Sequence, residues 1–185
     1  MKSNQRIIEN KIIGDKVCFL AMAEETQGQL THLHIELKPG GGTERHYHDK
    51  FTEIFKAIEG SLSVESEGET LILEEGQEKR IEILTLHKFF NSTSSPITFE
   101  VRIEPASRNF EEFLQIMYGL ARDGKTNKKG IPTNLLHIGA ISVLGDTLPP
   151  RRSLLFILSR LFSWLGRIAE RRGVLEELRN KYVRY

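Results

Sequence analysis

Hydrophobic and polar residues alternate in short runs up to about residue 105, the pattern of half-buried β-strands. In "THLHIELKPGGG" the alternate residues Leu33, Ile35 and Leu37 are apolar, and a proline with three glycines ends the run. Two Glu-Gly turn signals divide "FTEIFKAIEGSLSVESEGETLILEEGQ" as in a strand meander, and "KRIEILTLHKFFN" and "ITFEVRIEP" each read as one further strand. Short strands with regularly spaced turns predict an all-β sandwich or barrel.

At Pro105 the period changes to that of a helix. "FEEFLQIMYGLA" predicts an amphipathic helix capped near Ser107 or Asn109, and "TNLLHIGAISVLGD" predicts a second helix after a polar loop. In "SLLFILSRLFSWLGRIAERRG" the polar residues share one face and nearly all others are apolar, so deep burial is expected. We therefore expect a β-barrel domain at 1–106 and a helical C-terminal extension at 107–185, packed on the barrel or on a dimer partner.

Composition and charge narrow the class of protein. The chain has 185 residues, 39% of them hydrophobic, which suffices for a buried core, and a net charge of +1. Residues 151–185 hold nine Arg or Lys against three Glu, so the rest of the chain is acidic. This asymmetry favours docking of the extension on the barrel or in a homodimer, with membrane-surface contact through Trp164 and the arginines as the alternative. No nucleic-acid-binding motif is visible.

The start of the chain, "MKSNQRIIENKIIGDK", is polar, and no run reaches the ~18 apolar residues of a membrane span. We therefore expect a cytoplasmic protein. The single cysteine, Cys18, lies in the apolar run "KVCFLAMA" and cannot form an intramolecular disulfide. A buried core thiol is the expectation for it.

Two histidines on alternate positions carry the candidate chemistry. Residues i and i+2 of a strand point to one side, so His46 and His48 can aim both imidazoles at one point. Glu53 returns on the next strand, and His87 in "LTLHKFFN" is the candidate for a fourth ligand from another strand. Three imidazoles and one carboxylate suit one divalent transition metal ion, Fe, Mn, Ni, Co or Zn, and leave positions for water or substrate.

These residues resemble the cupin superfamily. Read from Gly40, the stretch is G-x5-H-x-H-x4-E-x6-G, similar to the first cupin motif at every position, and His87 with Asn91 matches the H-x3-N that ends the second motif. Over about residues 15 to 105, the resemblance implies a mainly β, double-stranded β-helix, or jelly-roll barrel, with one metal in its mouth. Relatives usually have Pro and Gly where this chain has Glu82 and Leu84, so the strand before His87 is expected to run straight.

The alternation also predicts which side chains line the barrel beside the metal. The set is largely apolar and aromatic: Phe51, Phe55, Ala57, Ile83, Thr85, Phe89 and Asn91. Such a pocket suits a small oxygenated organic molecule better than a sugar phosphate, although the phenylalanines could equally be barrel core. Catalytic residues stay unassigned, because no second acid or base is identifiable. A metal-dependent dioxygenase or isomerase, a non-catalytic ligand-binding or sensing protein, and a structural barrel all remain open.

Other motifs are given ordinary interpretations. "GLARDGKT" matches the P-loop pattern, but a helix instead of a strand precedes it, so no nucleotide-binding site is predicted. His32 and His34 alternate with apolar residues and have no carboxylate at a useful distance, so they are expected on the polar face of their strand. His137 in the helical extension is given the same interpretation.

Overall fold

The computed structural model describes residues 6–144, 146–150, 154 and 158–184. Nine strands come first: β1 (Ile7–Asn10), β2 (Asp15–Ala21), β3 (Thr31–Leu37), β4 (Thr52–Glu59), β5 (Leu62–Ser66), β6 (Glu69–Leu73), β7 (Glu78–Ile81), β8 (His87–Phe90) and β9 (Ile97–Glu104). The helices in the described part of the chain follow: α1 (Arg108–Arg122), α2 (Leu135–Leu144), α4 (Ser159–Arg171) and α5 (Val174–Tyr182). The change from strand to helix thus falls near Pro105, where the sequence pattern changes period.

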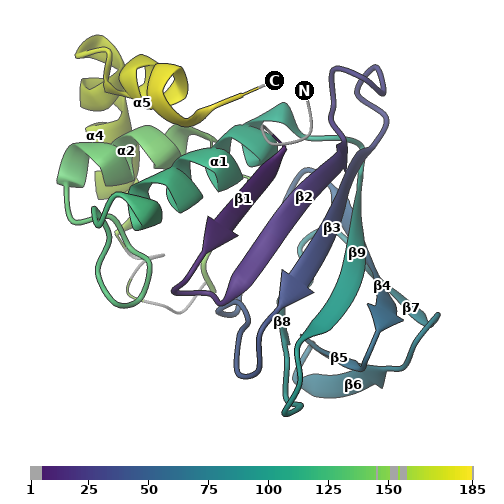
Figure 1. Cartoon of the computed structure of the whole chain (residues 1–185). Coiled ribbons are helices and arrows are strands. Elements are labelled where there is room, and N and C mark those ends of the chain that lie inside the picture. Colours follow the sequence, from purple (N-terminus) through teal and green to yellow (C-terminus); the bar gives the residue numbers. More distant parts are fainter. Residues whose placement is uncertain (1–5, 145, 151–153, 155–157, 185) are drawn as a thin grey trace.

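The strands form two antiparallel sheets (Figure 1). The larger has the order β1-β2-β3-β9-β4-β7, and the smaller has the order β6-β5-β8. β5 therefore pairs with β6 as the turn signal predicts, but it leaves the sheet of β4. This arrangement, followed by helices, confirms the mainly β jelly-roll fold with a helical C-terminal extension. The helices gather beyond the β1 edge of the large sheet.

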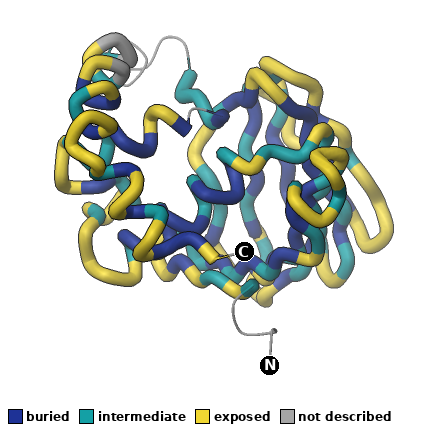
Figure 2. Tube along the Cα trace, turned by 90° about the horizontal axis from the view of Figure 1, so that it is seen from above, coloured by how far each residue is buried: buried dark blue, intermediate teal, exposed yellow. Residues whose placement is uncertain are grey.

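The barrel core follows from the alternation in the strands. In β3 and β9 every second residue is buried, and Phe55, Phe89 and Phe99 meet in the interior with ring centroids 5.1 to 6.4 Å apart. Figure 2 shows this buried layer along the strands and a second one among the helices. α1 joins the two layers, because Phe110 and Tyr118 pack in the barrel core while Ile116 packs in the helical core.

The prediction of a single strand across "KRIEILTLHKFFN" is wrong. The chain forms β7, bends at residues 82–86, and resumes as β8 in the other sheet. Leu84 takes the left-handed conformation, with φ 65°, at the position where relatives in the resembled family usually have glycine. The bend also turns Ile83 outward, so that its side chain is 43% exposed instead of lining the barrel.

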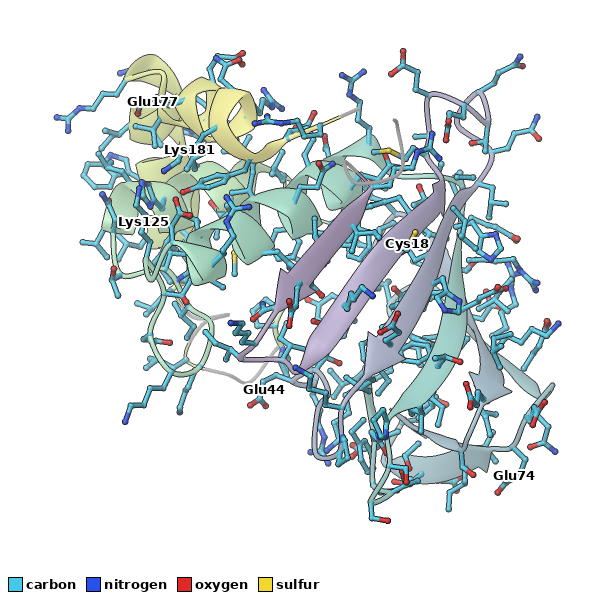
Figure 3. All side chains as sticks on the ribbon, in the orientation of Figure 1. Cys18, Glu44, Glu74, Lys125, Glu177 and Lys181 are labelled. Carbon is cyan, nitrogen blue, oxygen red and sulfur yellow. The ribbon has the colours of Figure 1, made fainter. Side chains whose placement is uncertain are left out.

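Cys18 is not a core thiol. In β2 the buried positions are Asp15, Val17 and Phe19, so the cysteine between the last two lies on the opposite face with intermediate exposure. Figure 3 labels it on this outer face of the large sheet. The apolar run around Cys18 belongs to a half-buried strand, whose period of two places only alternate residues in the core.

The helical extension begins as the sequence predicts, with Ser107 as the N-cap accepting from the backbone N–H of Phe110 at 3.1 Å. α2 and α4 approach closely through glycines, since a Cβ on Gly139 would lie 2.6 Å from the backbone of Leu165. The deep burial expected of α4 is wrong: Leu161 and Trp164 are 47% and 56% exposed, because α2 covers only one face. Residues 153 and 155–157 of that predicted helix lie outside the described residues, as do the side chains of residues 159, 160 and 163.

We predict that Leu84→Gly stabilises the protein by up to about 1 kcal/mol. Glycine removes the steric clash of the Cβ in the left-handed conformation. The free energy gained in this way exceeds the free-energy cost of the extra conformational entropy that glycine gives the unfolded chain. Because Leu84 is exposed, removing its side chain costs the protein little packing energy. Denaturant unfolding measures the difference. Leu84→Ala keeps the Cβ and should give no gain, so equal stabilisation by both variants would contradict backbone relief.

The carboxyl group of Asp15 is buried and accepts a hydrogen bond from the Tyr118 hydroxyl. Burial, only partly offset by that hydrogen bond, raises the pKa of Asp15 to about 6. The folded protein therefore holds the proton more tightly than the unfolded chain, and stability should fall by about 3 kcal/mol as the pH rises from about 4 to above 6.

Asp15→Asn should remove this decrease, because the amide does not ionise. Urea unfolding at several pH values measures it, with the parent and the variant compared at each pH. The variant's free energy of unfolding, relative to that of the parent, should rise through this window. A difference that stays constant with pH would contradict the assignment.

Candidate metal centre

The candidate site lies between the two sheets. Glu53 is on β4 of the large sheet, and His87 begins β8 of the small one. His46 pairs with His87 through two reciprocal backbone hydrogen bonds of 2.9 Å, which fix the segment that carries His46 and His48 against β8. Gly42 permits this approach, because a Cβ there would lie 2.6 Å from the carbonyl oxygen of Phe89.

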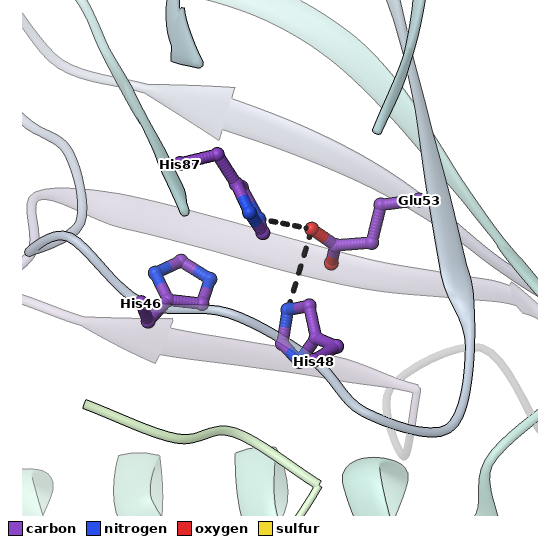
Figure 4. A group of neighbouring side chains, drawn as sticks. All are labelled: His46, His48, Glu53 and His87. Carbon is purple, nitrogen blue, oxygen red and sulfur yellow. Dashed lines mark hydrogen bonds and ion pairs between the residues drawn. The ribbon is translucent and has the colours of Figure 1, made fainter. Parts of the chain in front are cut away.

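The four predicted ligands come together in the folded chain (Figure 4). One ligand atom from each of His46, His48, Glu53 and His87 can be chosen so that all lie within 4.8 Å of one another. Oε2 of Glu53 lies 2.9 Å from Nε2 of His87 and 3.4 Å from Nε2 of His48. His48, Glu53 and His87 are buried, while His46 keeps intermediate exposure. Solvent therefore reaches the cluster on the His46 side.

Each imidazole is oriented by a backbone carbonyl. The Nδ1–H of His46 donates to Glu44 O at 2.7 Å, that of His87 to Thr85 O at 2.8 Å, and that of His48 to a carbonyl at 2.6 Å. A carbonyl oxygen can only accept, so the proton of each neutral ring sits on Nδ1. The three Nε2 atoms then present lone pairs toward one another and toward Glu53.

This arrangement requires a positive charge at its centre. Lone pairs and a carboxylate in buried surroundings repel one another unless a proton or a cation lies between them. Nε2 of His48 is buried and has no hydrogen-bond partner among the described residues. Burial alone would raise the pKa of Glu53, but His48 and His87 hold it well below its ordinary range.

The surroundings shift the pKa values of His46 and His48 in opposite directions. Burial, reinforced by the neighbouring His87 and His48, lowers the pKa of His46 to about 3, so this ring is neutral near pH 7. Burial also acts to lower the pKa of His48, but the Glu53 carboxylate outweighs it and raises the pKa above its ordinary value. A cation bound to the four groups would replace the proton that Glu53 otherwise draws to an imidazole. The donor set and its protonation therefore fit a divalent metal ion.

The residues predicted to line a pocket lie mainly in the packed interior. Phe51, Phe55, Ala57 and Phe89 belong to the buried core. The Phe51 ring stacks on His48 with centroids 4.3 Å apart. Thr85 contributes its carbonyl to His87, and the amide of Asn91 donates to the carbonyls of Leu37 and Ser95 at 3.1 and 2.8 Å. Of the seven predicted lining residues, four are thus core side chains, Thr85 orients a candidate ligand through its backbone, and Ile83 is exposed.

The sequence pattern missed the contribution of the helical extension. The carbonyl that accepts from His48 belongs to Asp146, 98 residues further along the chain. The Phe110 ring in the first turn of α1 also contacts His48 edge-on, with centroids 5.6 Å apart. No periodicity links these residues to His48. Only the sharp Gly-Asp break after the second helical stretch marked the segment as irregular.

The other candidate motifs lie away from the cluster. His32 and His34 face outward from β3, where His32 pairs with Glu100 at 3.0 Å, as expected for a polar face. His137 is on α2 with intermediate exposure. Gly119 of the P-loop-like sequence is inside α1 against the Tyr182 ring, so that sequence begins within a helix. No helix in the described part of the chain is long and apolar enough to cross a membrane.

Comparison with known proteins agrees with the fold and the motifs. The cupin domain family matches residues 33–102, which include all four clustered side chains, so this part of the chain is a cupin domain. No curated protein matches the sequence.

Similar solved structures include two with a TM-score of 0.50. A predicted oxalate decarboxylase from Thermotoga maritima is 16% identical, with 57% of this chain and 96% of that chain covered. An RmlC-like cupin from Shewanella frigidimarina is 17% identical, with 60% and 92% covered. A cupin-superfamily sugar phosphate isomerase from Silicibacter pomeroyi is 23% identical with a TM-score of 0.46, and the match covers 52% of this chain and 62% of that one. At sequence identities this low, the similarity shows a shared fold and nothing about function.

Proposed function

We propose that this protein binds one divalent transition metal ion, Fe, Mn, Ni, Co or Zn, through His46, His48, Glu53 and His87. The observation that carries the proposal is the anchoring of all three Nδ1 atoms by carbonyls, which leaves three Nε2 lone pairs beside a buried carboxylate. Neutral imidazoles and a carboxylate are the ligands that such ions prefer. Anchored ring orientations are also the usual support of a metal-binding histidine.

The ligand proposed for this centre is a small oxygenated organic molecule. A bound metal ion would supply Lewis acidity and coordination positions for an oxygen ligand. The partly exposed His46 side gives that molecule its approach, while Phe51 and Phe110 keep water from the far side of His48. Dioxygenase-like cleavage is the proposed reaction if the metal is redox-active, and isomerisation if it is not.

Binding or sensing without turnover is the second candidate. Among the described residues, the hydrogen bonds and ion pairs of the Glu53 carboxylate go to His48 and His87 alone. Glu53 is therefore held as a ligand and is poorly placed to act as a free base. Product analysis with the metal-loaded protein separates the two candidates, because a binding protein would return its ligand unchanged.

Metal analysis provides the first test of the proposal. The parent protein, purified and reconstituted with each metal salt, should hold about one transition metal ion per chain, and a His46→Ala/His87→Ala double variant should hold almost none. Elemental analysis measures the content, and far-UV circular dichroism checks that the variant is folded.

The matched control is a His32→Ala/His34→Ala double variant, which removes another alternating histidine pair on the polar face of β3. It should keep the parent's metal content. The proposal would be overturned if the parent took up no metal, or if the two double variants lost it equally.

We also propose that the protein forms a homodimer through α4. The support is the pair of large apolar side chains, Leu161 and Trp164, that remain about half exposed on this helix in the single chain. A Leu161→Lys/Trp164→Lys double variant should shift the sedimentation mass from dimer to monomer while metal content stays unchanged. A monomeric parent protein, or a variant that stays dimeric, would contradict this association.

A further inference from the structure

The three histidines differ in the source of the carbonyl that orients them. His46 and His87 donate to carbonyls two residues earlier in their own segments, Glu44 and Thr85. Their rings are therefore set by local backbone conformation. His48 instead donates to Asp146, which follows α2 in the helical extension. Both residues are buried, at 3% and 4% exposure, and the distance is 2.6 Å.

Asp146 is itself held in place by its carboxylate. Lys50, two residues after His48, donates to Oδ1 at 2.6 Å. The hydroxyl of Ser107, the N-cap of α1, donates to Oδ2. One side chain thus connects the metal-binding segment to the start of the first helix while its own main chain orients a ligand. A buried carboxylate that accepts hydrogen bonds from two donors is a strong anchor.

The neighbouring backbone extends this contact. Tyr47, between the two histidines, exchanges hydrogen bonds with Leu148, its N–H donating at 3.0 Å and its carbonyl accepting at 2.9 Å. Leu148 therefore forms an isolated β-bridge with Tyr47, and this bridge joins residues 146–148 to the segment that carries His46 and His48. We call residues 146–148 the docking segment.

We propose that Asp146 is a positioning residue of the metal centre, which makes docking of the helical extension and metal binding mutually dependent. The inference rests on the proposed metal-binding function. When the docking segment is in place, the Asp146 carbonyl holds His48 with its proton on Nδ1 and its Nε2 lone pair toward Glu53. When it is displaced, His48 loses its orientation while all four ligands remain in the chain. By linkage, a metal ion that selects the oriented ring also favours the docked segment.

The test is a Co²⁺ titration of the metal-free full-length protein, followed by visible absorption and by competition with a chelator. Asp146→Ala should bind Co²⁺ about 10 to 100 times more weakly than the parent, the usual effect of losing support for a ligand. Its Co²⁺ spectrum should also change, because His48 is no longer held in one orientation. Asp146→Asn keeps an oxygen for Ser107 and should recover part of the affinity.

Asp123→Ala is the matched control. Asp123 is also in the helical extension, and its carboxylate accepts from Lys181 at 2.7 Å and from Tyr182 at 2.8 Å, but none of its hydrogen bonds reaches the metal centre. It should bind Co²⁺ within about twofold of the parent. Equal affinity in Asp146→Ala and the parent would overturn the positioning role, whereas a parent that binds no Co²⁺ would overturn the metal proposal itself.

A measurement on the parent protein keeps the inference testable if Asp146→Ala fails to fold. Saturating Co²⁺, or diamagnetic Zn²⁺ for detection by NMR, should slow hydrogen exchange at the amides of Tyr47 and Leu148. The amide of Asn127, which donates to Ile131 O at 2.8 Å in the loop after α1, should not change. Exchange at Tyr47 and Leu148 that is insensitive to the metal would show that docking and metal binding are independent.

Discussion

The rest of this structure is arranged around three imidazoles and a carboxylate that point to one largely buried location. Such a group cannot stay in low-dielectric surroundings without a positive charge. The pKa of Glu53, held well below its ordinary range, shows how strongly the carboxylate depends on the imidazoles. The backbone pairing of His46 with His87 serves the same arrangement, because it fixes two ligands from separate segments at one depth between the sheets.

The interior beneath the cluster is closely packed. Phe55, Phe89 and Phe99 fill the space between the sheets, and Phe51 stacks directly on His48. This packing makes the site rigid on its inner side and leaves the His46 side as the route from solvent. The clustered side chains therefore have aromatic rings on their inner side and solvent on the other.

The helical extension is part of the site, although the cupin match ends at residue 102. Phe110 contacts the His48 ring, Ser107 bonds to Asp146, and Asp146 bonds to His48. The segment that carries His46 and His48 lies outside the regular strands, so this external support adds to its pairing with β8. The same extension leaves Leu161 and Trp164 exposed, so its inner and outer surfaces have different roles.

The sequence by itself determined most strands, the N-cap Ser107 and the four side chains that converge at the centre. These depend on local signals: alternation, turn residues, capping and the fixed spacing of His46, His48 and Glu53. It misjudged the bend before His87, because Leu84 adopts a backbone conformation that its residue type disfavours. The sequence also predicted a core position for Cys18. Because nearly all its neighbours are apolar, the alternation of buried and exposed positions in this strand could not be seen in the sequence.

Only the tertiary structure decided that Asp146 orients His48, since a contact between residues 98 positions apart leaves no trace in periodicity. The exposed face of α4 was decided in the same way, by how much of it α2 covers. Residue types determine which side chains can bind a metal, but the packing of distant segments determines which of them are fixed in the orientation that binding requires.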